Sequence, residues 1–200
     1  MDRQQAVEAL QLLKKVVSQV RDDTALENWG MAWIVGGITN GGAFVATHFM
    51  LAAGIGQPLP FMALWLPVLA LNAGAMLIKQ RGGPASFVEA QVWNIWNTFT
   101  GAMILTGLVN WLLGLNHLFM APVAAILAAF AFSMMGSLMG RWWFVPAFIC
   151  CVTAIVTAFL PGWQFLLFGV VWGLVQCSNG LALHLARLRK LATAEKLRLV

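Results

Sequence analysis

Six long uncharged stretches dominate the pattern of apolar and polar positions along the chain. A helix of roughly twenty apolar residues is long enough to cross the hydrocarbon core of a bilayer. We therefore predict an all-α, polytopic membrane protein whose six transmembrane helices form three hairpins. The predicted spans are residues 28–53, 59–78, 93–113, 117–139, 142–160 and 163–184.

Charged residues lie between or beyond these stretches, and their order predicts the orientation. The 12 Lys and Arg residues precede the first span, separate the second from the third, occur at Arg141, or follow the sixth. The 7 acidic residues share those places. By the positive-inside rule these places are cytoplasmic. We therefore expect both termini in the cytoplasm, short uncharged turns outside, and residence in a plasma membrane, that is, a bacterial inner membrane.

Composition supports this class and excludes a soluble globular domain. The chain is 60% hydrophobic and 10% charged, with a mean hydropathy of +0.80, whereas soluble domains are about 25% charged. We divide the chain into a transmembrane domain at residues 24–184 and two cytoplasmic segments at residues 1–23 and 185–200. The motif Thr24–Glu27 matches a capping box, which predicts the start of the first spanning helix.

The segment 1–23 has the periodicity of an amphipathic helix. Leu10, Leu13 and Val17 belong to one apolar stripe, and polar side chains lie on the opposite face. Such a helix would contact a partner or a second copy, lie on the membrane surface, or pack against the cytoplasmic loops of its own chain. The pattern leaves these three alternatives open.

The basic segment 185–200 follows the sixth span without a helix-breaking residue, so we expect the helix to continue to about Leu199. Arg187, Arg189 and Lys190 alternate with leucines, which predicts a cationic amphipathic helix. It would bind a partner or anionic lipid, or serve only as a topology determinant. No nucleic-acid partner is expected, because no base-reading module accompanies the cations.

The spans offer no constellation for catalysis. None contains an Asp, Glu, Lys or Arg residue, although coupled ion transport commonly uses ionisable groups within the membrane. No nucleophile motif, phosphate-binding loop or metal-binding spacing occurs. We therefore assign no catalytic residue and no metal ligand. The three cysteines lie inside spans, where they are expected to act as small packing residues.

Six amides are the most informative polar residues of the spans. They lie in the inner half or near the middle of the predicted membrane, and they are Asn40, Asn72, Asn94, Asn97, Gln176 and Asn179. Amides both donate and accept hydrogen bonds, so together they could line a cavity for a neutral ligand. The alternative is that each amide joins two helices by a hydrogen bond.

Two histidines lie near the predicted outer face. His48 is close to the end of the first span, and His117 begins the fourth. They suggest a pH response or, if opposed across a cavity, a bis-histidine haem site. Hydrogen bonding at the membrane interface is the simpler role. No cofactor is predicted.

Glycine and tryptophan also follow patterns. Gly37/Gly41, Gly136/Gly140 and Gly169/Gly173 have the GxxxG spacing that allows two helices to approach closely, either within the bundle or between copies. Each predicted hairpin begins with a tryptophan pair, which we interpret as residues at the membrane interface or as a threefold repeat. The pairs are Trp29 and Trp33, Trp93 and Trp96, and Trp142 and Trp143.

These patterns leave three functions open. We expect a non-enzymatic membrane scaffold or sensor subunit that associates with itself or with a cytoplasmic or membrane partner through its terminal helices. The alternative is a facilitator or channel for a small neutral solute through an amide-lined bundle. A third interpretation is a haem-binding redox protein of the membrane.

Overall fold

The fold of this computed structural model is all-α. The structure describes residues 7, 8, 10–12, 15, 29–80, 87–114 and 117–198, and no strand occurs in these residues. The all-α part of the predicted fold class is therefore confirmed. The elements are α2 (Trp29–Ala52), α3 (Pro58–Gln80), α4 (Phe87–Leu112), η1 (His117–Phe119), α5 (Met120–Met139), η2 (Arg141–Trp143), α6 (Phe144–Phe159) and α7 (Gln164–Arg198).

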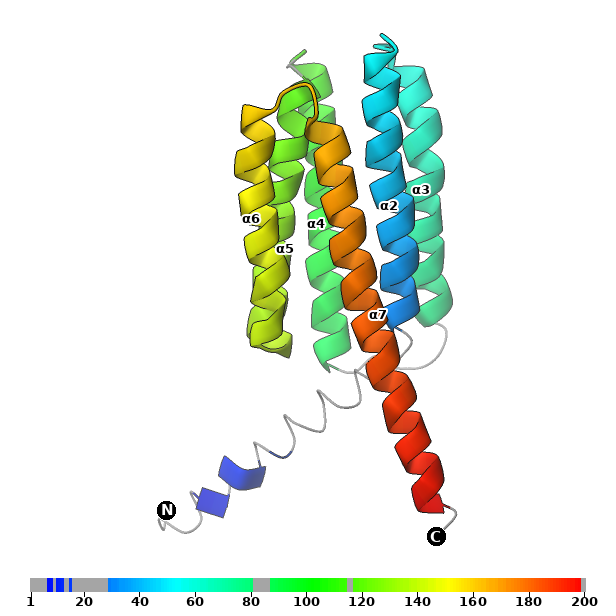
Figure 1. The fold of residues 1–200 in the computed structure, drawn as a ribbon, viewed down its shortest axis with the longest axis vertical. Coiled ribbons are helices and arrows are strands. Elements are labelled where there is room, and N and C mark those ends of the chain that lie inside the picture. Colours follow the sequence, from blue (N-terminus) through cyan, green and yellow to red (C-terminus); the bar gives the residue numbers. More distant parts are fainter. Residues whose placement is uncertain are drawn as a thin grey trace.

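The six long helices lie side by side as a bundle, and α7 extends well beyond one end of it (Figure 1). Among the described residues, four helices are long and apolar enough to cross a membrane. The four segments are Trp29–Ala52, His117–Met139, Arg141–Phe159 and Gln164–Thr193. In α3 the strongly apolar part is the shorter segment Pro58–Gly74.

Two helices extend beyond their predicted spans. Helix α4 begins at Phe87 rather than at residue 93, with Glu89 in its first turn, where the helix dipole favours an acidic side chain. Helix α7 continues to Arg198, as the lack of a helix breaker indicated. The six described residues of segment 1–23 are helical. The rest of that segment and the Thr24–Glu27 motif lie outside the described residues.

The end of α2 shows how sequence sets a boundary. Gly54 adopts a φ of +76°, which only glycine takes up readily. The amide of Ile55 donates to the carbonyl of Met50 (3.0 Å), and the amide of Gly54 donates to that of Leu51 (3.0 Å). These bonds form a Schellman-type cap that satisfies the last carbonyls and turns the chain toward α3.

Helices α2 and α7 pack backbone to backbone along most of α2. Glycines line this contact on both helices: Gly30, Gly37 and Gly41 of α2, and Gly169, Gly173 and Gly180 of α7. A Cβ atom added to Gly30 would lie 2.5 Å from the carbonyl oxygen of Gly180. We call these six residues the glycine seam. Two of the three GxxxG motifs therefore pack helices within one chain.

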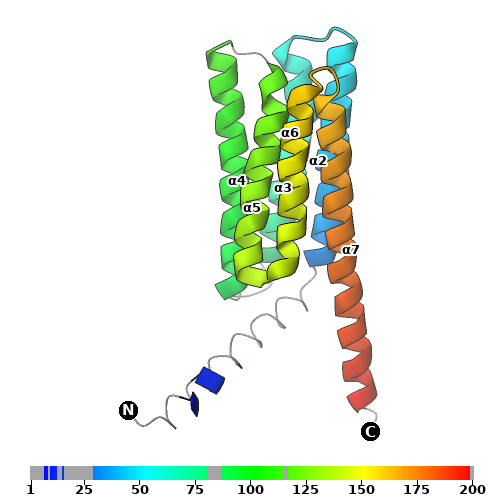
Figure 2. The ribbon, with the colours of Figure 1, turned by 60° about the vertical axis from the view of Figure 1, so that its left-hand side comes forward.

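A second close contact joins α5 and α6, which lie side by side (Figure 2). Gly136 leaves room for the ring of Phe144, whose Cε2 atom would be 2.8 Å from an added Cβ. The next glycine of this motif, Gly140, forms the turn with a φ of +121°. Alanines fill the buried face of α5: Ala121, Ala124, Ala125, Ala128, Ala129 and Ala131.

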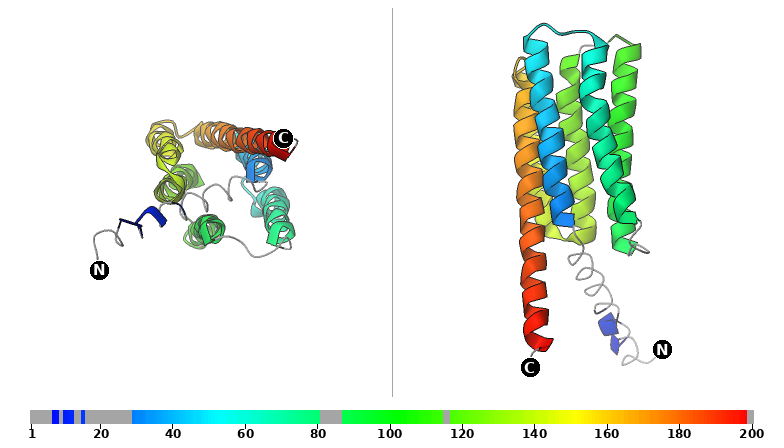
Figure 3. Two further views of the ribbon diagram at one scale, coloured as in Figure 1. Left: turned by 90° about the horizontal axis from the view of Figure 1, so that it is seen from below. Right: turned by 90° about the vertical axis from the view of Figure 1, so that its right-hand side faces the viewer.

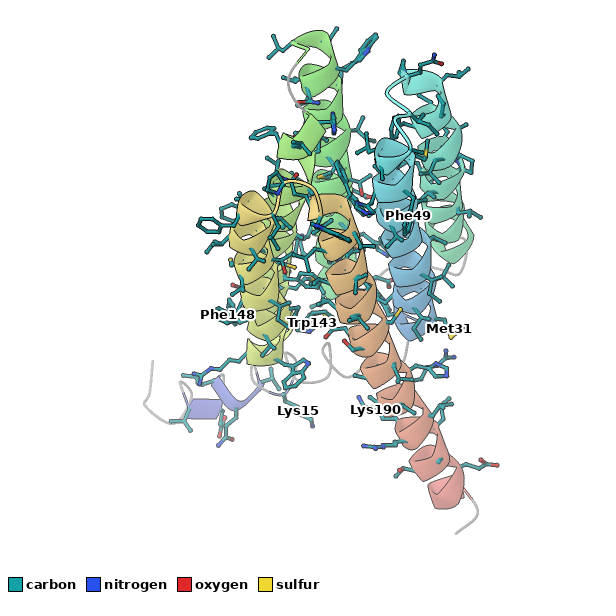
Figure 4. All side chains as sticks on the ribbon, turned by 45° about the horizontal axis from the view of Figure 1, so that its top comes forward. Lys15, Met31, Phe49, Trp143, Phe148 and Lys190 are labelled. Atoms are coloured by element: carbon teal, nitrogen blue, oxygen red, sulfur yellow. The ribbon has the colours of Figure 1, made fainter. Side chains whose placement is uncertain are left out.

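The outside of the bundle is apolar. Met31, Phe49 and Phe148 carry side chains that point away from the neighbouring helices (Figure 4), and they are 42%, 61% and 69% exposed. An exposed apolar surface of this extent is typical of a protein embedded in lipid rather than in water. Membrane association follows from this surface together with the four apolar helices.

The glycine seam generates a prediction with a matched control. A Cβ at Gly41 would lie 2.9 Å from the carbonyl oxygen of Gly169, so Gly41→Ala must separate two backbones. At Gly42 the added atom meets nothing within 4 Å. We expect Gly41→Ala to destabilise the protein by about 1–3 kcal/mol, as overpacking typically does. Gly42→Ala should have no such effect. Thermal unfolding in detergent gives the melting temperatures of the two variants. Equal melting temperatures of Gly41→Ala and Gly42→Ala would contradict the close packing at the glycine seam.

Candidate functional site

Asn40 and Asn72 form a hydrogen-bonded pair between α2 and α3. The Asn72 side-chain nitrogen donates to Oδ1 of Asn40 (3.1 Å) and to the carbonyl of Val68 (2.9 Å). The Asn40 nitrogen donates to the carbonyl of Gly36 (2.8 Å). A Cβ at Gly36 would lie 3.8 Å from both amides, at ordinary contact distance. Both amide nitrogens therefore donate to protein groups.

The same interface carries a second polar contact closer to the α2–α3 turn. The indole nitrogen of Trp65 donates to the hydroxyl of Thr47 (3.2 Å), which in turn donates to the carbonyl of Ala43 (2.8 Å). Thr47 is only 5% exposed. In lipid an unpaired polar group has no alternative partner, so these bonds fix the rotation of α3 against α2. Both contacts agree with the helix-joining role considered for the amides.

The other candidate amides do not join this pair through any hydrogen bond in the described part of the chain. Asn179 donates to the carbonyl of Val175 in its own helix (2.7 Å). Gln176 is 7% exposed and packs against Gly37 of the seam. Asn94 and Asn97 are exposed on α4. The structure thus brings together two of the six amides and distributes the rest.

The two outer histidines contact different aromatic rings. His48 stacks on Trp163 with ring centroids 5.5 Å apart, and His117 stacks on Phe165 at 6.5 Å. Both partners belong to the α6–α7 turn region, so the histidines lie at the same end of the bundle. Each imidazole therefore has a packing role. Within the described residues, no group of three or more His, Cys, Asp or Glu side chains could hold a metal ion.

The partner or lipid contacts predicted on the terminal segments lie at the surface where they are described. Arg189 is exposed, whereas Arg187 and Lys190 are half-buried. Leu10 is 57% exposed. Leu13 and Val17 lie outside the described residues. The projecting part of α7 therefore presents both leucines and cations along one continuous helix (Figure 4).

Four tryptophans form a buried aromatic cluster inside the bundle. Trp29, Trp33, Trp96 and Trp143 are 4%, 6%, 9% and 6% exposed, so their rings face the interior of the bundle rather than lipid. They pack inside the bundle against one another and against Phe132, which is fully buried. Only Trp142 of the three pairs is strongly exposed, at 69%.

Ring contacts link the three tryptophan pairs to one another. Trp33 lies 5.1 Å from Trp96 and 5.0 Å from Trp143, and Trp29 lies 5.0 Å from Trp93. The starts of α2 and α6 consequently lie close to the second and third turns of α4. The Trp33–Trp96 contact is edge-to-face, a geometry that is favourable beyond the area that it buries. The recurring tryptophan pairs are visible in the sequence, but the sequence does not show which helices bring their rings into contact.

The fold and these contacts define an all-α protein with a membrane-compatible exterior. No protein-family model, curated protein or solved structure matches the chain. Functional inference therefore rests on the chain's own residues.

The Asn40–Asn72 pair generates a prediction for a double-mutant cycle. Asn40→Leu and Asn72→Leu each remove the shared hydrogen bond, so their destabilising effects should not add. We expect a coupling free energy of about 0.6 kcal/mol, a typical value for a hydrogen bond between membrane helices. Reversible unfolding in mixed micelles measures it.

The control cycle combines Asn40→Leu with Asn179→Leu. Asn179 bonds to its own helix, so these two effects should be additive within error. A coupling of the Asn40–Asn72 cycle no larger than that of the control cycle would show that the bond does not hold α2 to α3.

Proposed function

We propose that the protein is a non-enzymatic scaffold or sensor subunit of a plasma membrane, specifically a bacterial inner membrane. All six long helices cross the bilayer as three hairpins, and both termini are cytoplasmic. The terminal helices engage a second copy or a cytoplasmic or membrane partner. The observation that carries the proposal is the length of α7.

Helix α7 is a single element of 35 residues. At 1.5 Å per residue it is about 50 Å long, whereas the hydrocarbon core of a bilayer is about 30 Å thick. Gly30, at the start of α2, packs against Gly180 and His184. The part of α7 beyond His184 therefore leaves the bundle (Figure 1), and in the proposed orientation it stands in the cytoplasm.

Exposed residues form a row along this helix at spacings of three and four. The row consists of Leu174, Ser178, Leu181, Leu185, Leu188 and Ala192. Helical periodicity places it about 120° around the helix from the glycines that pack on α2. Within the bilayer such leucines face lipid, but beyond it Leu185 and Leu188 (43% and 48% exposed) would face water. A partner that covers them would remove this apolar surface from water.

The orientation of the bundle has support from the position of its cations. Arg141 lies beside Trp142 and Trp143, and the ring of Trp143 contacts Trp33 near the start of α2. Arg187 and Arg189 lie on the projecting part of α7 at that same end. The positive-inside rule assigns this end to the cytoplasm.

The test replaces the exposed leucines of the projecting segment. Leu185→Glu with Leu188→Glu should reduce cross-linked complexes in native membranes at least fivefold, because two charges oppose an apolar contact. Ala186→Glu adds a charge away from the row and should leave the complexes unchanged. Cross-linking with a lysine-reactive reagent followed by mass analysis gives the yields. Unchanged complexes in the double variant would contradict the proposal.

A further inference from the structure

Helix α4 carries its polar residues on the side that faces away from the bundle. Asn94, Asn97, Thr98 and Gly101 are exposed, and Leu105 and Leu108 continue the same face. Their spacing of three and four residues places them on one side of a helix. Val92 and Trp96 lie on the opposite side, in the core, where they are 0% and 9% exposed. We call this exposed side the outward face of α4.

The polar residues of the outward face of α4 lie on the outside of the bundle. Viewed along the bundle, α4 lies at the edge of the group of helices (Figure 3), and its main neighbour is α5. The contacts Trp29–Trp93 and Trp33–Trp96 place α4 at the same height as α2. Counted from the start of the predicted span at residue 93, Asn97 is about 6 Å along the helix, at 1.5 Å per residue. In a membrane-crossing bundle this position lies in the inner part of the bilayer.

The two amides of the outward face have no hydrogen-bond partner in the described residues, in contrast to Asn40, Asn72 and Asn179. Hydrocarbon supplies no donor or acceptor, so an amide left in contact with lipid is strongly unfavourable. The outward face of α4 therefore requires a protein cover that offers both donors and acceptors at this depth.

A second copy of the chain satisfies this requirement. Copies in one membrane share one orientation, so a two-fold axis along the membrane normal brings each residue against its own counterpart. An amide is its own complement, since it both donates and accepts. No charged residue lies on the outward face to cause repulsion.

The remaining residues of the face fit a close helix pair. Gly101 is exposed, and a Cβ added there would meet nothing within 4 Å, so a neighbouring backbone can approach it. Small residues at such positions are typical of contacts between membrane helices. Leu105 and Leu108 (60% and 46% exposed) would pack beyond the glycine.

We propose that α4 is the dimerisation helix of this protein, with the Asn94 and Asn97 amides of two copies hydrogen-bonded to each other across a two-fold axis. This inference rests on the membrane-crossing arrangement of the proposed function. It adds a second contact, inside the bilayer, that is separate from the projecting part of α7.

The test is disulfide cross-linking in native membranes, in a background with Cys150→Ala, Cys151→Ala and Cys177→Ala. Asn97→Cys should form a covalent dimer under mild oxidation, because equal residues meet at the axis. Ile155→Cys is the matched control, since Ile155 is 61% exposed on α6 and away from α4. It should remain monomeric. Equal yields at both positions, or a product with the mass of a different protein, would overturn the proposal.

A second measurement uses proteins that retain the native cysteines. Asn94→Leu with Asn97→Leu should weaken the dimer in liposomes roughly tenfold, as expected for two lost interhelical hydrogen bonds. Asn97→Gln keeps an amide and should retain most of the association. Energy transfer between labelled copies gives the dissociation constants. Unchanged association in the double variant would contradict the amide contact.

Two readouts separate failure of this inference from failure of the proposed function. The Leu185→Glu, Leu188→Glu variant should still form the Asn97→Cys dimer, because α4 does not use the projecting part of α7. A membrane-impermeant maleimide should not label Asn97→Cys even after the membrane is opened, whereas Arg141→Cys should then react. Labelling there would refute the membrane position of α4 itself, whereas protection without cross-linking would refute only dimerisation.

Discussion

The inability of hydrocarbon to supply hydrogen bonds is the constraint on which the rest of this structure depends. Asn40 and Asn72 pair across two helices, and the hydroxyls of Thr47 and Thr157 donate to carbonyls in their own helices. Arg141 and the cations of α7 lie at the end of the bundle where α2 begins. The positions of the polar groups thus determine the contacts between helices, and they are the basis of the proposed orientation.

The glycine seam holds α7, whose last part projects beyond the bundle, against α2. Because Gly41 and Gly169 bring two backbones into contact, α2 and α7 form one packed pair, and interlocking contacts resist sliding. The tail of α7 continues the same helix without a break. The tail is therefore rigidly connected to the part of α7 that packs on α2.

Much of the fold could be predicted from local pattern, whereas the pairing of helices could not. Runs of uncharged residues located the helices, and GxxxG spacing indicated close packing. The spacing did not reveal that Gly37 faces Gln176 and Cys177 of α7, since partner choice depends on all helices at once. For the same reason the spacing of the tryptophans did not reveal that Trp33 packs against other helices, and the depth of the amides did not reveal the direction that each one faces.

The central claim is that six helices cross the bilayer with every charge on one side. Single cysteines in a cysteine-free background test it through labelling with a membrane-impermeant maleimide. Cysteines at Gly56 and Gly162, in the turns α2–α3 and α6–α7, should react in intact cells. Cysteines at Arg141 and Thr193 should react only after the membrane is opened. Labelling of Arg141→Cys in intact cells would contradict the account.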